Sequence, residues 1–149
     1  GVPFGETGVV LRIAPSHPGQ QVFTARLSGD EEVPPVETQA HGQAIFRFQR
    51  DFSEMNYKLV VDNLQNAFAA HIHCAPAGVN GPVGVTLFSG GPTSMNGVLV
   101  QAAVTSPNEG NACGWTTLED VVNAIQNDNA YVNVHTTANP GGEIRGQIR

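Results

Sequence analysis

The stretch that decides the fold runs from Ala69 to Cys74 and reads AAHIHC. Its apolar residues and histidines alternate, and this pattern predicts a β-strand, because successive side chains of a strand point to opposite faces of a sheet. His71 and His73 therefore share one face, while Ala70, Ile72 and Cys74 share the other. We expect Ile72 in the core and both histidines on the outer side of the sheet.

A second segment, YVNVHT at residues 131–136, alternates in the same way. Its two valines are predicted to point to the core, whereas Tyr131, Asn133 and His135 lie on the opposite face. If the two strands are neighbours, three imidazoles converge. Neutral imidazoles suit copper or zinc, although a His-x-His pair alone is equally compatible with ordinary surface histidines.

The rest of the chain is typical of a turn-rich β protein, with 17 Gly, 10 Pro and only 13% charged residues. One credible helix, Leu118–Gln126, carries an apolar stripe, and the TTLE sequence at 116–119 resembles a capping box. We predict an all-β fold, an antiparallel Greek-key β-sandwich of about eight strands with one short helix. The expected strands are 21–27, 42–50, 55–61, 69–74, 83–88, 97–104, 131–136 and 143–148.

Length and charge limit the domain organisation and the partners. A chain of 149 residues favours one domain, predicted at 21–149, preceded by an N-terminal arm at 1–20. The net charge of −6 and the lack of a basic run argue against binding to nucleic acid or to an anionic membrane surface. The sequence holds no apolar run long enough for a transmembrane helix.

The two cysteines, Cys74 and Cys113, are interpreted as one disulfide, with two buried free thiols as the alternative. A disulfide indicates an oxidising compartment. It would also tie the end of the His-x-His strand to the loop before the helix.

Several other polar residues are candidates for a supporting role. His41 is a candidate additional ligand, and His17 is a weaker one; a surface position is the alternative for each. Asn133 shares the face of His135 and is expected to support the ligands. Glu143 and Arg145 either support His135 in the same way or form a surface ion pair of little energetic weight.

The acidic residues of the Pro-rich turn suggest calcium, but they lack the spacing of a calcium-binding loop, so a solvated acidic turn is the better interpretation. No nucleophile elbow, P-loop or dinucleotide motif is present, and no catalytic residue is assigned. The acids in question are Asp30, Glu31, Glu32 and Glu37.

Four segments resemble the CHRD domain, a family named from chordin and widespread in exported microbial proteins. They read LSGDEEVPPV at 27–36, AAHIH at 69–73, GVNGPV at 78–83 and YVNVHTTANPGGEIRGQI at 131–148. The resemblance extends from Gln21 to Arg149 in the same order. It implies an extracytoplasmic β domain, periplasmic or secreted, but no settled activity.

A more distant resemblance links the chain to copper/zinc superoxide dismutase. The AHIH and VNVH segments are similar to that enzyme's copper-binding strands, which implies copper ligands at His71, His73 and His135. No histidine lies between Cys74 and Ala130, so the bridging histidine and the zinc cluster have no counterpart. Glu143 stands where the enzyme has an arginine, and a carboxylate there repels an anion rather than steering it.

These inferences lead to one favoured function and two alternatives. The favoured function is an exported copper-binding protein with a mononuclear three-histidine site, used in copper handling or redox chemistry. Zinc is the alternative metal, because imidazoles alone do not choose between the two. The alternative functions are a superoxide-dismutase-like copper oxidoreductase and a metal-free extracellular interaction module. The sequence indicates neither a protein partner nor an oligomeric state.

Overall fold

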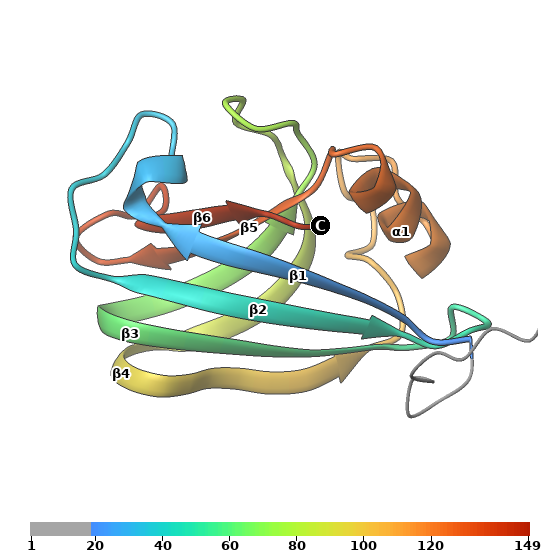
Figure 1. Cartoon of the computed structure of the whole chain (residues 1–149), viewed down its shortest axis with the longest axis horizontal. Coiled ribbons are helices and arrows are strands. Elements are labelled where there is room, and N and C mark those ends of the chain that lie inside the picture. The colour runs from blue at the N-terminus through green and yellow to red at the C-terminus, as the bar shows by residue number, and fades with distance from the viewer. Residues whose placement is uncertain (1–18) are drawn as a thin grey trace, which may run out of the picture.

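The computed structural model describes residues 19–149, so most of the expected N-terminal arm, and His17 with it, lies outside the described residues. Within the described part the chain forms six strands, one α-helix and a short 3-10 helix (Figure 1). The strands are β1 (Gln21–Ser28), β2 (His41–Phe48), β3 (Met55–His73), β4 (Val83–Val104), β5 (Tyr131–Thr136) and β6 (Ile144–Gln147); the helices are η1 (Gly29–Glu31) and α1 (Leu118–Gln126). The predicted all-β class with one short helix is confirmed.

The strands form one antiparallel sheet in the order β2-β1-β6-β5-β3-β4. Strand β3 is long enough to pair with β2 along its first half and with β5 along its second half, so the sheet returns to β3 and closes as a barrel. Strand β4 pairs with β3 outside this ring as an extra strand (Figure 1). The sequence led us to expect a sandwich of two packed sheets, whereas the structure has a single sheet that closes on itself.

Strands β3 and β4 each combine two of the strands expected from the sequence, which is why six strands replace eight. The predicted break at residues 62–68 is bridged by irregular pairing, with register shifts on either side of Leu64. Asn63 and Asn66 adopt positive φ values of 55° and 57°, which asparagine tolerates better than most residues. These β-bulges bend the long strand without ending it.

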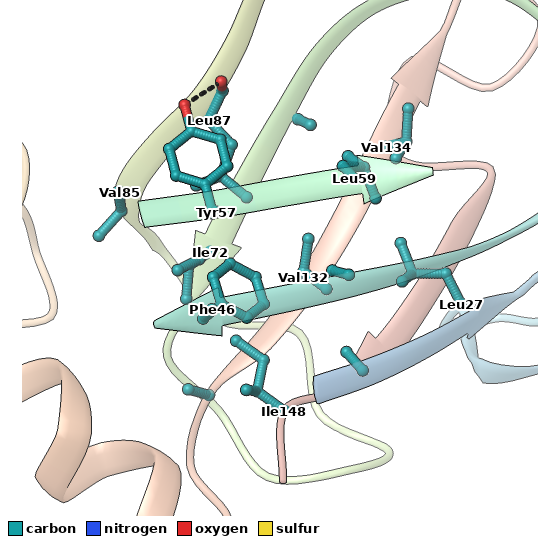
Figure 2. Close-up of a cluster of buried hydrophobic side chains, with 14 of the residues drawn as sticks. Leu27, Phe46, Tyr57, Leu59, Ile72, Val85, Leu87, Val132, Val134 and Ile148 are labelled. Carbon is teal, nitrogen blue, oxygen red and sulfur yellow. Dashed lines mark hydrogen bonds between the residues drawn. The ribbon is translucent and has the colours of Figure 1, made fainter. Parts of the chain in front are cut away.

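The core fills the barrel (Figure 2). The buried apolar residues of α1 belong to the same cluster. The alternating positions expected to face inward do so, including Phe46, Phe48, Leu59 and Ile72, each fully buried. The Tyr57 hydroxyl, buried among them, donates a hydrogen bond to the carbonyl of Leu87, so its polar end is satisfied. The inward face of β3 therefore fixes which side chains of the same strand must point outward.

Helix α1 has the predicted bounds and buries its apolar stripe. The predicted capping box at Thr116 and Glu119 is wrong by one residue. Because helical geometry begins at Leu118, the third helical residue is Asp120, and Thr117 caps the helix by accepting a bond from the Asp120 amide at 3.3 Å. Among residues 19–149 no helix has the length and apolarity needed to cross a membrane.

Candidate metal centre

Neighbouring strands bring the three histidines together on the outer face of the barrel. In the antiparallel register of β3 and β5, Ala69 lies opposite His135 and His73 lies opposite Tyr131. His71 lies between them on β3 and points to the same side. Two strands of fixed register thus carry all three imidazoles, which the sequence pattern could only place on matching faces.

The nitrogens of the cluster have a spacing suited to one metal ion. Nδ1 of His71 lies 3.1 Å from Nε2 of His135. One nitrogen from each of His71, His73 and His135 lies within 4.8 Å of the others. With metal–nitrogen bonds of about 2.0–2.1 Å, two ligands of a tetrahedral ion are about 3.3 Å apart. The first pair already meets this distance, and the third nitrogen has to move closer by up to about 1.5 Å.

Backbone carbonyls fix the orientation of two of the rings. His73 donates from Nδ1 to the carbonyl of Gly81 at 2.9 Å, and His135 donates from Nδ1 to the carbonyl of Pro140 at 2.8 Å. Each bond fixes the tautomer and places a lone pair on Nε2, an arrangement common in metal-binding histidines. In the metal-free protein the His135 lone pair accepts the Nδ1–H of His71, so His71 would have to carry its proton on Nε2 to ligate a metal through Nδ1.

The strongest indication of a bound metal ion is the Nε2 atom of His73. Nε2 of His73 is buried and has no hydrogen-bond partner in the described part of the chain. A buried polar atom without a partner is costly and demands an explanation such as an ion or a water. A metal ion held jointly with His71 and His135 would satisfy it.

Burial keeps the rings of His71 and His73 neutral near pH 7. Burial lowers the pKa of His71 to about 4, and repulsion from His135 and His73 adds to this effect. Burial also lowers the pKa of His73, although its hydrogen bond to Gly81 opposes the shift. Since only a neutral imidazole offers its lone pair, these two ligand candidates stay competent below the pH at which an ordinary histidine is protonated.

A stack of three side chains supports His73 from the side. The Tyr131 ring lies parallel to the His73 imidazole, with centroids 4.8 Å apart, and the Arg145 guanidinium lies 3.4 Å from the centroid of the Tyr131 ring. Arg145, for which the sequence left open a surface ion pair or support of His135, is only 1% exposed. It acts instead as a buried link between β6 and the loop that covers the site.

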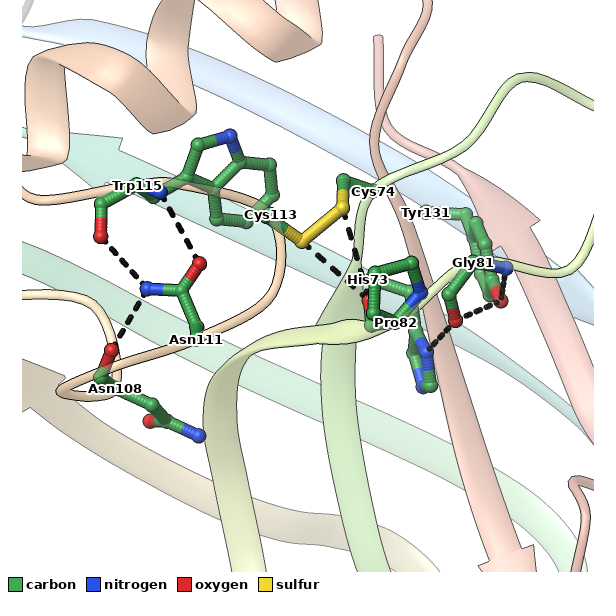
Figure 3. Close-up of a disulfide and its surroundings, with 9 residues drawn as sticks. All are labelled: His73, Cys74, Gly81, Pro82, Asn108, Asn111, Cys113, Trp115 and Tyr131. Carbon is green, nitrogen blue, oxygen red and sulfur yellow. Dashed lines mark hydrogen bonds between the residues drawn. A yellow bond between two sulfur atoms is a disulfide. The ribbon is translucent and has the colours of Figure 1, made fainter.

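That covering loop, residues 74–82, is held at both ends. Arg145 donates to the carbonyls of Pro76 and Val79 at 3.0 and 2.9 Å, and the Gly81 amide donates to the Tyr131 hydroxyl at 3.1 Å. The expected disulfide joins Cys74 to residue 113, in the segment before α1 (Figure 3). The carbonyl that orients His73 therefore belongs to a well-anchored segment.

Glu32 is the residue near the site that sequence reasoning missed. It was expected in a solvated acidic turn, but it is buried at 5% exposure, beside Asn133 and Gly142. Burial raises its pKa to about 7, against the lowering effects of Arg145 and of a hydrogen bond from Asn133. Nothing in the local sequence separates Glu32 from its exposed neighbours Asp30 and Glu31, because the contact that buries it comes from residues about a hundred positions later.

Glu143 fixes the turn that follows His135. It accepts hydrogen bonds from Thr38 at 2.6 Å, Thr136 at 2.7 Å and Asn139 at 3.2 Å. Burial works against ionisation, but these bonds together lower its pKa. The turn so fixed carries the Pro140 carbonyl that orients His135, so Glu143 is held by these bonds and supports His135 through the turn.

His41 stands apart from the cluster. It is exposed, and its Nε2 lies 3.3 Å from the carboxylate of Asp62. It lies at the start of β2, opposite Asp62 in the first half of β3, whereas the histidine pair lies near the other end of that long strand. It serves below as a control residue.

Together, the fold and the cluster define an all-β domain whose outer face carries three imidazoles able to hold a metal ion. The chain belongs to the CHRD domain family, whose model matches residues 23–148. No curated protein and no solved structure matches the chain. The likeness to copper/zinc superoxide dismutase therefore remains an interpretation of the sequence.

Proposed function

We propose that this domain binds one copper ion through Nδ1 of His71 and Nε2 of His73 and His135. The observation that carries the proposal is the buried, unpartnered Nε2 of His73, lying in a cluster whose two other imidazoles are already within ligand distance of each other. Two of the three rings are pre-oriented by backbone carbonyls, so little ordering remains to be done when the ion binds.

Copper is favoured over zinc by the general affinity order of divalent ions for nitrogen ligands. The ion would be either a cargo that the protein handles or a centre that changes oxidation state. The chain's own residues would hold and orient the imidazoles. The disulfide fits an oxidising compartment, which supports an exported protein, periplasmic or secreted.

The deciding experiment offers equimolar copper and zinc to the purified protein, removes free metal by desalting, and measures metal content by mass spectrometry. We expect one copper per chain in the native protein and in His41→Ala, the matched surface control, and little or none in His71→Ala or His135→Ala. Far-UV circular dichroism confirms that each variant is folded. Equal copper in all four proteins, or none in any, would remove the site and leave the metal-free interaction module as the better reading.

A dismutase-like reaction at this site is the weaker candidate. Glu143 stands where the resemblance places the enzyme's arginine, and three hydrogen bonds favour its ionised form, so it repels an anionic substrate. Arg145 is covered by the 74–82 loop and engaged by its carbonyls. We expect copper-loaded protein to accelerate superoxide decay no more than copper bound to a simple histidine peptide, and a rate far above that reference would favour the enzyme.

A further inference from the structure

Two buried acceptor atoms at the cluster lack a hydrogen-bond donor. Nε2 of His73 and Oδ1 of Asn133 are both buried, and neither has a hydrogen-bond partner among the described residues. Asn133 is directly opposite His71 in the β3–β5 register and faces the same side of the barrel. It is 3% exposed, so bulk water does not satisfy its oxygen.

Each of the two atoms is identified as an acceptor from the surroundings of the other polar atom in the same side chain. The Nδ1 proton of His73 is used by the Gly81 carbonyl, so Nε2 carries a lone pair. The Asn133 amide nitrogen lies towards the Glu32 carboxylate: a Cβ placed on Gly142 would be 2.5 Å from Nδ2 of Asn133 and 2.6 Å from Oε2 of Glu32. Once Glu32 is ionised it accepts but cannot donate, so it favours the amide nitrogen as its neighbour and turns the carbonyl oxygen away.

The opposite end of the amide lies towards the imidazole. Asn133 lies between Tyr131 and His135 on the outward face of β5, directly opposite His71 and diagonally across from His73, so an oxygen turned away from Glu32 points into the group of imidazoles. Glu32, Asn133 and His73 therefore form a polar row that ends at the cluster. Two acceptors that face each other repel, and a cation bound by both, or a water that donates to both, relieves the repulsion.

We propose that Asn133 supplies the fourth ligand of the copper ion, through Oδ1, and that Glu32 fixes the orientation of its amide. This inference rests on the proposed function and adds a fourth ligand to the proposed three-histidine site. Three imidazoles and one amide oxygen form a four-coordinate site without an open position inside the protein. An amide oxygen is a hard ligand, so it stabilises the cupric more than the cuprous ion.

The test compares copper-loaded native protein with Asn133→Leu, which removes the oxygen with little change of volume, and Asn133→Ala, which leaves room for a water. Asn56→Leu, elsewhere on β3, is the matched control. Cupric and cuprous affinities are measured by competition with chelators, and the cupric site is examined by electron paramagnetic resonance and visible absorption.

We expect every variant to keep one copper per chain. Asn133→Leu should lose on the order of ten- to a hundred-fold in cupric affinity, with a smaller change in cuprous affinity and altered resonance parameters. Asn133→Ala should fall between it and the native protein, because water replaces the oxygen. Glu32→Gln should change the spectrum less than Asn133→Leu, since it affects only the orientation of the amide.

Identical spectra and cupric affinities in native protein and both Asn133 variants would overturn the inference, since the buried acceptors would then be bridged by a water that does not touch the ion. That result leaves the three-histidine site intact. Failure of the native protein to bind copper at all would instead overturn the proposed function, so the two failures are distinct. If Asn133→Leu does not fold, Asn133→Ala carries the same comparison.

Discussion

The imidazole of His73 and the ring of Tyr131 lie parallel, with an angle of 4° between their planes and 4.8 Å between their centroids. The two residues are cross-strand partners on β3 and β5, so the contact is set by register. The same tyrosine accepts a hydrogen bond from Gly81, whose carbonyl orients His73. Tyr131 thus restricts the orientation of the His73 ring in two ways, by stacking on it and by holding its hydrogen-bond partner Gly81.

Replacing Tyr131 separates these two contributions. Tyr131→Phe keeps the stack but removes the hydroxyl, and we expect it to lower the free energy of unfolding by about 1 kcal/mol. Tyr131→Leu removes both and should cost about 2–4 kcal/mol. Urea unfolding gives the energies, and copper competition gives the affinities, which we expect to fall in the same order. Equal copper affinity in the two variants would show that stacking does not position His73.

Arg145 is expected to hold the covering loop. Arg145→Met leaves the carbonyls of Pro76 and Val79 without their donor and should destabilise the protein by about 2–4 kcal/mol. Hydrogen exchange should show faster exchange of the amides of residues 79 and 81 than in the native protein. The control is Arg149→Met, because the Arg149 side chain is 69% exposed and its ion pair with Asp128 is worth little. Unchanged loop exchange in Arg145→Met would mean that the disulfide alone anchors the segment.

The disulfide is expected to stabilise both the fold and the site. It closes a loop of 39 residues, for which loss of chain entropy in the unfolded state predicts about 4 kcal/mol of stabilisation. The double variant of Cys74→Ser and Cys113→Ser should unfold at correspondingly lower urea concentration and should bind copper more weakly than native protein. Full copper affinity in this folded variant would show that the loop position does not depend on the cross-link.

How far the sequence predicts this structure depends on the range of the interactions involved. Alternation is a local property, so it correctly placed His71, His73 and His135 on the outer face and Ile72 and Val132 in the core. It did not reveal that β3 continues through Asn63 and Asn66, because a bulge is stabilised by the neighbouring strand and not by its own residues. The closed barrel follows from that continuity and was missed with it.

The polar surroundings of the site were harder to predict than the histidines. Arg145 and Glu32 look like surface residues because charged side chains are rarely buried. Their burial depends on partners distant in sequence, namely loop carbonyls at 76 and 79 for Arg145 and the Asn133–Gly142 contact for Glu32. No local pattern encodes such partners, whereas the disulfide could be inferred because only two cysteines are present.

The buried acid and the buried imidazoles predict opposing pH dependences of stability in the metal-free protein. Burial raises the pKa of Glu32 from 4.5 to about 7, so between these values the folded state holds a proton that the unfolded state has released, and stability falls as pH rises. Burial lowers the pKa of His71 from 6.5 to about 4, so in that interval the unfolded state holds the extra proton and stability rises with pH. The two effects offset each other over most of the range.

Glu32→Gln removes only the first effect and should expose the second. We expect its free energy of unfolding, minus that of native protein, to increase as pH rises from about 4.5 to about 7 and to level off above. The measurement is urea unfolding at successive pH values in the presence of a chelator. Glu31→Gln, at an exposed neighbouring position, is the control and should show a flat difference. A flat difference for Glu32→Gln as well would mean that Glu32 is ionised in the folded protein at low pH, held so by Arg145 and Asn133 despite its burial.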